Sequence, residues 1–307
     1  MLRYVIRRIS AMLPVAFVAI TTCFFIIRLA PGGPFDRERT LPPTIKANML
    51  AAYDMDQPLW VQYFRYIGRL LHGDLGPSMV NQTFSVNEMI ALGFPFTATL
   101  GLSAFVLATT AGILAGTISA LNQNKWPDYL LVLFVMVGVV VPNFLTAHLM
   151  QLVFGVYLRW LPAAGYSPGS LLHLIMPVIV LGLAHAARVS RLMRGSMIEV
   201  LGTNYVRTAR AKGLGERLVI ARHALRPALM PVVSYLGPGL SYLLTGSLVV
   251  EQVFGLPGIG KYFISAALNR DYGLVLGTVI LYIFIILVLN LLVDLVYALL
   301  DPKVRYS

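Results

Sequence analysis

The sequence predicts an all-α protein that is embedded in a membrane and crosses it six times. Hydrophobic residues make up 58% of its 307 residues and charged residues only 12%, and the mean hydropathy is +0.76. Soluble domains carry about 25% charged residues, so a polytopic membrane protein is the class that fits this composition. Six apolar segments each approach the length of about 20 residues that a helix needs to cross a bilayer. They lie at 9–29, 96–121, 129–154, 171–189, 228–250 and 274–300.

The first apolar segment is expected to remain in the protein as a membrane anchor over residues 1–29. Arg3, Arg7 and Arg8 precede it, as cations precede the apolar part of a secretory signal. However, the segment is long enough to span, and no small-residue cleavage site follows it. The arginines place the N-terminus in the cytoplasm under the positive-inside rule. Six spans then place the C-terminus there as well, beside Lys303.

Residues 30–95 form an extracytoplasmic loop that is too long to be a simple connector. It contains an amphipathic stretch at 44–53 and a cluster of aromatic residues at 60–66. We expect a small helical cap lying on the outer membrane surface. The aromatic residues fit either an interfacial belt or a landing surface for an external partner, and both readings stay open.

Polar residues within the spans are few, and such residues usually face the bundle interior or water. Asn143 and His148 lie in the third span, just after Pro142, and are candidates for a translocation pathway. Asp294 is the only acidic residue deep inside a predicted span. A proton-driven carrier would need a chain of carboxylates across the membrane, so this mechanism is disfavoured.

The segment 191–226 between the fourth and fifth spans is a basic loop. Its cations would together cost roughly 15–20 kcal/mol at the bilayer centre, so the loop must be cytoplasmic. They are Arg207, Arg210, Lys212, Arg217, Arg222 and Arg226.

A short helix is expected within this loop. Thr203 or Asn204 can cap its N-terminus, and Gly213 suits the left-handed position just past its end. Tyr205, Thr208 or Ala209, and Lys212 recur at helical spacing and are expected on one face. Such a helix could dock into a groove on another protein. Alternatively, the arginines only hold the loop in the cytoplasm and nothing binds it. The candidate docking residues are Asn204, Tyr205, Thr208, Ala209, Lys212 and Gly213.

The fifth span is expected to be interrupted by prolines and glycines. A proline in lipid frees a carbonyl that protein, hydroxyl groups or cavity water must satisfy, and broken helices often line substrate pathways. Tight packing of helices through small residues explains the composition equally well. The pathway candidates in this span are Ser234, Gly237, Pro238 and Ser241.

Catalysis and nucleotide binding by this chain are disfavoured. Residues 255–262 resemble a nucleotide phosphate loop. However, Pro257 removes an amide donor, and Tyr262 replaces the serine or threonine whose hydroxyl would bind magnesium. No metal-ligand cluster or nucleophile–base arrangement is evident. The net charge of +11 is explained by cytoplasmic loops rather than by nucleic-acid binding. The energy source must therefore come from a partner.

Two motifs of the basic loop carry a family resemblance. The sequence Tyr-Val-Arg-Thr-Ala-Arg-Ala-Lys-Gly-Leu at 205–214, followed by Arg-His-Ala-Leu-Arg-Pro-Ala-Leu-Met-Pro at 222–231, resembles the cytoplasmic signature of ABC importer permease subunits. Arg207 stands where the general pattern has an acidic residue, a departure typical of the peptide/nickel branch. With His-Gly-Asp-Leu-Gly at 72–76 and Glu-Gln-Val-Phe-Gly-Leu-Pro-Gly-Ile-Gly at 251–260, the order of motifs is similar to the B-type permease of bacterial oligopeptide importers.

This resemblance implies a type I ABC importer permease fold in the bacterial inner membrane, with a five-helix core over 96–307. It implies that the basic loop forms a coupling helix in a cleft of an ATPase. The implied partners are a homologous C-type permease, two ATPases that bind ATP and Mg, and an extracytoplasmic peptide-binding protein, in addition to membrane lipid. Dipeptides, nickel chelates or other small cargo remain alternatives, as does a stand-alone channel or secondary carrier. An outer loop near the binding protein is expected to include Glu251, Phe254, Pro257, Gly258 and Gly260.

Overall fold

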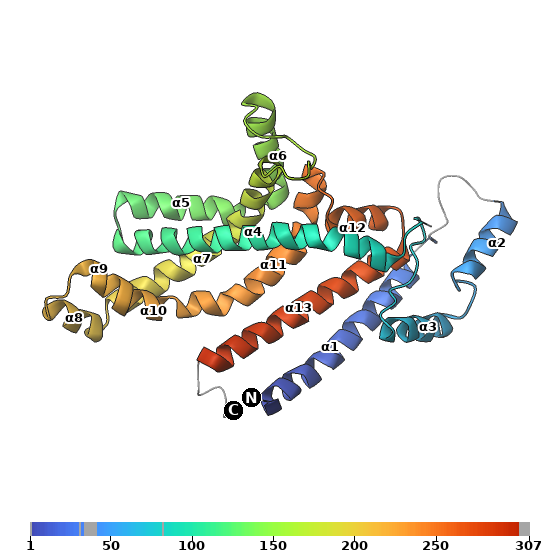
Figure 1. Cartoon of the computed structure of the whole chain (residues 1–307), viewed down its shortest axis with the longest axis horizontal. Coiled ribbons are helices and arrows are strands. Elements are labelled where there is room, and N and C mark those ends of the chain that lie inside the picture. The colour runs from blue at the N-terminus through green and yellow to red at the C-terminus, as the bar shows by residue number, and fades with distance from the viewer. Residues whose placement is uncertain (1, 31, 34–41, 82, 301–307) are drawn as a thin grey trace. The chain divides into compact units, whose positions relative to one another are not determined.

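The structure of the chain is a computed structural model that describes residues 2–30, 32–33, 42–81 and 83–300 (Figure 1). Within these residues the secondary structure is helical, apart from one isolated bridge between Pro77 and Ser85. The predicted all-α class is confirmed. Lys303 and the side chains of Arg3 and Asp294 lie outside the described part. The helices are α1 (Leu2–Leu29), α2 (Pro43–Ala52), α3 (Leu59–Leu71), α4 (Val86–Leu121), α5 (Trp126–Val140), α6 (Asn143–Met150), η1 (Gln151–Tyr157), α7 (Leu172–Leu201), α8 (Asn204–Ala211), α9 (Glu216–Leu218), η2 (Val219–Ala224), α10 (Leu225–Ala228), α11 (Met230–Phe254), α12 (Ile259–Leu268) and α13 (Tyr272–Leu300).

Among the described residues, α1, α4, α7, α11 and α13 are each long and apolar enough to cross a membrane. The third predicted span, 129–154, is not one helix. It divides into α5 and the pair α6–η1, which are bent by 106° relative to each other. Pro142 explains the break, because it has no N–H to donate and it pushes the preceding residue out of the helical region. Val141 accordingly has φ −80° and ψ 121°.

Helix α7 extends well past the predicted end of the fourth span at residue 189. It continues to Leu201, so the basic loop begins at Gly202 rather than at residue 191. The extension forms because Met193, Met197 and Val200 follow one another at helical spacing and are all buried. Tertiary packing of this apolar face therefore sustains the helix through its charged residues.

Helix α11 is continuous, so the expectation of an interrupted fifth span is wrong. Pro231 lies in its first turn, where the missing N–H would have had no partner in the helix. Pro238 lies inside the helix without ending it. The neighbouring Gly237 and Gly239 are both buried, which indicates close packing on that side of the helix.

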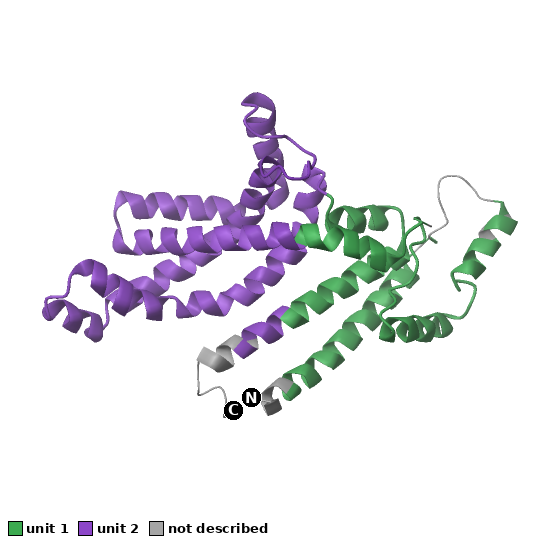
Figure 2. Cartoon of the chain, viewed as in Figure 1, with its two compact units in different colours: residues 1–97, 257–288 green, residues 98–256, 289–307 purple. Residues whose placement is uncertain are grey.

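The chain divides into two compact units (Figure 2), one of residues 1–97 and 257–288 and the other of residues 98–256 and 289–307. In the first unit, Phe24, Tyr63 and Leu276 form a buried aromatic and aliphatic cluster. The core of the second unit is larger and gathers side chains from α4, α7, α8, η2, α10 and α11. This second core holds the basic loop, from Gly202 onward, in place.

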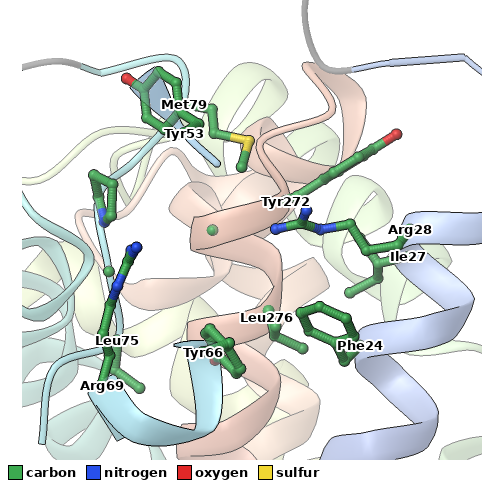
Figure 3. A pocket seen from close by; sticks show the side chains of 13 residues that line it. Phe24, Ile27, Arg28, Tyr53, Tyr66, Arg69, Leu75, Met79, Tyr272 and Leu276 are labelled. Atoms are coloured by element: carbon green, nitrogen blue, oxygen red, sulfur yellow. The ribbon is translucent and has the colours of Figure 1, made fainter. Parts of the chain in front are cut away.

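The first unit also contains a small pocket (Figure 3) lined by side chains of α1, α3 and α13. Its volume is about 40 Å³, which suits a few water molecules and not a peptide. The Arg28 guanidinium lies 5.1 Å from the centre of the Phe24 ring. Burial raises the pKa of the Tyr66 hydroxyl, although nearby Arg28 opposes this. The pocket is therefore a structural feature of the first unit.

Candidate functional site

Only Gly202 and Thr203 separate helix α8 from the end of α7. The amide of Gly202 donates to the Glu199 carbonyl at 3.1 Å, and the amide of Thr203 donates to the Val200 carbonyl at 3.1 Å. Thr203 occupies the capping position of α8 with an extended backbone, but no side chain caps the helix. Its hydroxyl donates instead to the Val200 carbonyl at 2.6 Å. The predicted side-chain cap is therefore wrong, and Thr203 ties α8 back to α7.

Helix α8 has one buried face and one exposed face. Val206 is 0% exposed and Ala209 is 5% exposed, and both belong to the core of the second unit. Tyr205 is 46% exposed, and Thr208 and Lys212 are also exposed. Of the residues predicted to share a docking face, Tyr205, Thr208 and Lys212 are available to a partner, whereas Ala209 packs inward. Asn204 is exposed at the start of the helix.

The C-terminus of α8 ends in a Schellman motif. The amide of Gly213 donates to the Arg210 carbonyl at 2.9 Å, and the amide of Leu214 donates to the Ala209 carbonyl at 3.4 Å. These are the two bonds that define the motif, which needs a left-handed residue between them. Gly213 has φ +77°. The left-handed conformation predicted for Gly213 is therefore confirmed.

An exposed ion pair fixes the turn that follows. The Arg210 guanidinium donates to both carboxylate oxygens of Glu216, at 3.1 Å from Nε and 2.6 Å from Nη2. This hydrogen bonding lowers the pKa of Glu216 and raises that of Arg210. Arg207, Lys212 and Arg217 are exposed around the pair. The surface of this segment is therefore strongly cationic.

Beneath that surface, the basic segment is packed firmly onto α7. Val219 and Ala224 of η2 are 0% exposed, and they join Val206 against Met193 and Met197 of α7. A short helix could not keep a fixed orientation by its own backbone bonds, so this packing holds α8 in place. The arrangement presents a rigid, basic helix to a complementary surface.

Residues 112–306 match the family described as the inner membrane component of binding-protein-dependent transport systems. The chain belongs to this family. The likeness extends further in individual proteins: the oligopeptide transport system permease protein OppB of Escherichia coli (strain K12) is 50% identical over 307 residues, covering all of both chains. OppB of Haemophilus influenzae is 49% identical over 306 residues, again covering all of both chains. The dipeptide transport system permease protein DppB of Bacillus subtilis is 40% identical and covers 99% of this chain and 98% of its own.

Solved structures place this transport component in the expected fold. An inward-facing structure of the MetNI methionine ABC transporter has a chain that matches with a TM-score of 0.56 and 15% identity, over 69% of this chain and 96% of that one. An amino acid ABC transporter with histidines matches with a TM-score of 0.51 and 16% identity, over 68% and 92%. The predicted type I ABC importer permease fold is confirmed.

In this transport component, the pathway candidates on α11 have different surroundings. A Cβ atom at Gly237 would collide with the Val293 side chain, and the Ser241 hydroxyl is buried without a hydrogen-bond partner among the described residues. Gly237 therefore faces α13, and Ser241 is buried. Pro238 is exposed and Ser234 is half-buried, and the Ser234 hydroxyl donates to the Met230 carbonyl at 2.9 Å. Only Ser234 and Pro238 therefore keep surface for a permeating molecule.

The pathway candidates of the third span both lie in α6, after the bend, with Asn143 as its first residue and His148 in its last turn. Asn143 is half-buried. His148 is exposed, and its Nδ1 lies 2.7 Å from the Phe144 carbonyl oxygen of the same helix. Gln151 then anchors η1, because its amide nitrogen donates to the carbonyls of Ala163 and Val253, each at 2.9 Å. The bent segment is thus tied to the end of α11.

The outer-loop candidates are mostly internal to the chain. Glu251 is 0% exposed and Phe254 is 2% exposed, and Gly258 and Gly260 are also buried. Pro257 alone of the five is exposed. The structure therefore gives four of these residues a packing role.

The sequence reasoning missed a buried ionic cluster between α4, α5 and α7. Asp128 is 2% exposed, and the Arg194 guanidinium donates to both of its carboxylate oxygens, each at 2.8 Å. The Ser119 hydroxyl also donates to Asp128, and the amide of Asn124 donates at 3.0 Å. Asp128 lies in the first turn of α5, a position that favours an acidic residue, but its arginine partner is 66 residues away.

Proposed function

We propose that this chain is one transmembrane subunit of an ATP-driven importer of oligopeptides and forms half of its translocation pathway. One observation carries the proposal: the identity of 50% with OppB of E. coli extends over the full length of both proteins. Pairing with a homologous permease, two ATPases and an extracytoplasmic peptide-binding protein follows from the same likeness. The setting is the bacterial inner membrane.

The contact with the ATPase is assigned to helix α8. Tyr205, Thr208 and Lys212 present exposed side chains there, and Ala209 anchors the opposite face. The cations around this helix favour a cleft with acidic groups in the partner. Gly213 ends the helix where the chain turns back toward α9. Motion of the ATPase would reach the membrane helices through the packed core under α8.

ATP and Mg are assigned to the partner ATPases. The phosphate-loop look-alike at 255–262 follows helix α11 rather than a strand, and α12 begins only at Ile259. A nucleotide phosphate loop requires a preceding strand and a run of free amides. Pro257 removes one of those amides, so this turn is unsuited to nucleotide.

The orientation places α8 and both termini in the cytoplasm. The cations of the basic segment support it, since positively charged loops are retained on the cytoplasmic side. The helices α2 and α3 then lie on the outside, in the long loop after α1. Access of a membrane-impermeant amine reagent to Lys212 from the outer aqueous phase of intact cells would contradict this orientation.

Reconstitution tests the assigned function. Proteoliposomes containing the chain with its partner subunits and binding protein should accumulate a labelled tetrapeptide only when ATP is supplied. Liposomes containing the chain alone should accumulate none. Uptake by the chain alone would establish a stand-alone channel or secondary carrier and refute the proposal.

The coupling role is tested by charge reversal on the exposed face of α8. Lys212→Glu should lower ATP-driven uptake at least tenfold while leaving the amount of protein in the membrane unchanged. Lys261→Glu is the matched control, because Lys261 is exposed on α12, far along the chain from α8. Equal uptake by the two variants would count against α8 as the ATPase contact.

Dipeptides are the second candidate cargo, favoured by the identity of 40% with DppB of B. subtilis. Competition distinguishes the two. An excess of unlabelled tri- and tetrapeptides should suppress uptake of the labelled tetrapeptide more strongly than an equal excess of dipeptides. The reverse order would assign the importer to dipeptides.

A further inference from the structure

Helices α5 and α7 pack against each other, and two of their contacts lie on either side of a pocket. At one, a Cβ atom at Gly138 would lie 3.1 Å from Leu183 Cγ, so the two helices are in close contact. At the other, Asp128 forms its ion pair with Arg194. Between these contacts lies a pocket with a volume of about 380 Å³.

The lining of this pocket is amphipathic. Leu131, Val132 and Val135 of α5 form its apolar wall, and Ser190 and Arg191 of α7 contribute polar groups. The apolar groups come mainly from α5, and the polar groups come from α7 and from Ser119 of α4. Such a lining fits a ligand that is itself polar at one end and apolar along its length.

The pocket carries one uncompensated positive charge. The charge of Arg194 is neutralised by Asp128. Arg191 is exposed and forms no hydrogen bond or ion pair with the residues that the structure describes. A ligand with a single negative charge therefore matches the site.

The depth of the pocket corresponds to a membrane interface. About 20 residues of α7 from its start at Leu172 cross the hydrocarbon layer, which places Arg191 at its edge. Helix α5 begins nearby with Trp126, which is 73% exposed, and exposed tryptophan is typical of the interface. The apolar wall at 131–135 lies about one and a half to two and a half turns further along α5 than Trp126.

We propose that this pocket binds one anionic phospholipid of the leaflet on the α8 side. Its phosphodiester is bound by Arg191, and the first carbons of an acyl chain lie against Leu131 and Val135. Basic pockets between membrane helices are suited to acidic headgroups. The site is separate from the proposed peptide pathway and does not depend on the identity of the cargo.

Native mass spectrometry of the full chain, co-expressed with its partner subunits, tests the site. Phosphatidylglycerol and phosphatidylcholine with identical acyl chains are added in turn. The protein should retain phosphatidylglycerol at least fivefold more tightly. Arg191→Gln should weaken phosphatidylglycerol about fivefold, since one basic residue near the surface contributes about that factor, and should leave phosphatidylcholine unchanged.

Arg188→Gln is the matched control. It removes the same charge one turn earlier on α7, where the guanidinium lies 5.6 Å from the centre of the Tyr235 ring and outside the pocket. It should bind phosphatidylglycerol as the unaltered protein does. Val135→Trp, which fills the pocket, should weaken both lipids.

Several results would overturn the proposal. One is equal retention of the two lipids by the unaltered protein, and another is an equal effect of Arg188→Gln and Arg191→Gln. Displacement of the lipid by millimolar inorganic phosphate would show a free-phosphate site instead. Absence of the lipid from the complex, when the chain alone binds it, would show that a partner subunit occupies the pocket.

Discussion

Replacing Gly213 with valine tests how the backbone at the end of α8 supports coupling. Gly213 has φ +77°, and no other atom lies within 4 Å of a Cβ built there. A side chain would therefore meet open space, and the whole effect of Gly213→Val comes from backbone conformation. A left-handed conformation costs an ordinary L-residue roughly 1–2 kcal/mol, and valine is at the upper end because its Cβ is branched.

The alternative for valine is to leave the left-handed region and lose the Schellman bonds to Arg210 and Ala209. Each such bond contributes about 1 kcal/mol. Either route therefore costs about 1–3 kcal/mol, which is small beside a global stability of about 5–15 kcal/mol. The protein should remain folded and inserted. The population in which the last turn of α8 is unwound should rise about 5- to 150-fold, since about 1.4 kcal/mol corresponds to a factor of ten.

The assay is ATP-driven tetrapeptide uptake by proteoliposomes of the assembled complex, together with the amount of protein in the membrane. Gly213→Val should abolish most of the uptake at normal insertion. Gly213→Asn should retain more, because asparagine tolerates the left-handed region. Gly215→Val is the matched control: Gly215 has φ −60° and ψ 142°, which suits valine, and it also faces open space. Normal uptake with Gly213→Val would refute the reasoning.

Three further predictions concern stability. Arg194→Gln should lower the free energy of unfolding by about 3–5 kcal/mol, because it leaves the buried Asp128 carboxylate unpaired. Thermal unfolding measures this loss, and adding Asp128→Asn should restore most of the stability. Equal melting temperatures of the single and double variants would contradict the pairing. Asp271 is buried in the first unit and accepts hydrogen bonds from the Ser78 hydroxyl and from the amides of Met79 and Leu274. Asp271→Ala should therefore destabilise this unit by about 1–3 kcal/mol for each buried donor left without its acceptor, and an unchanged melting temperature would contradict this. Because Arg210 lowers the pKa of Glu216, the stabilisation from their pair is present above the usual glutamate pKa of about 4.3 and is lost as pH falls through the lowered value. Amide hydrogen exchange at 213–216, corrected for intrinsic rates, should therefore accelerate below about pH 4 and show no such step in Glu216→Gln.

The sequence predicts the parts of this fold that depend on local chemistry. Gly213 was identifiable because a left-handed residue after a short helix favours glycine. The number of apolar segments followed from composition and length. The sequence did not predict the break of the third span at Pro142. Proline inside an apolar span is also compatible with a continuous helix, as Pro238 shows in α11.

Features set by distant partners were not predictable in this way. Ala209 and Thr208 both fit a docking face by spacing, and only the packing against α7 decides that Ala209 is internal. The charged residues at 191–194 indicated a loop, yet the buried side of α7 keeps them helical, and Asp128 neutralises Arg194 from another helix. Glu251 and Phe254 belong to a motif, but a motif does not reveal whether its side chains point outward.

The two-residue turn between α7 and α8 couples the orientations of these two helices. Helix α7 has 30 residues and is therefore about 45 Å long at 1.5 Å per residue. The amides of Gly202 and Thr203 both donate to carbonyls in the last turn of α7. A tilt applied at α8 is therefore transmitted to the whole of α7, because the turn between the two helices has little freedom to bend. A rotation of about 5° would sweep the opposite end of α7 through about 4 Å, a displacement comparable to the diameter of a methyl group.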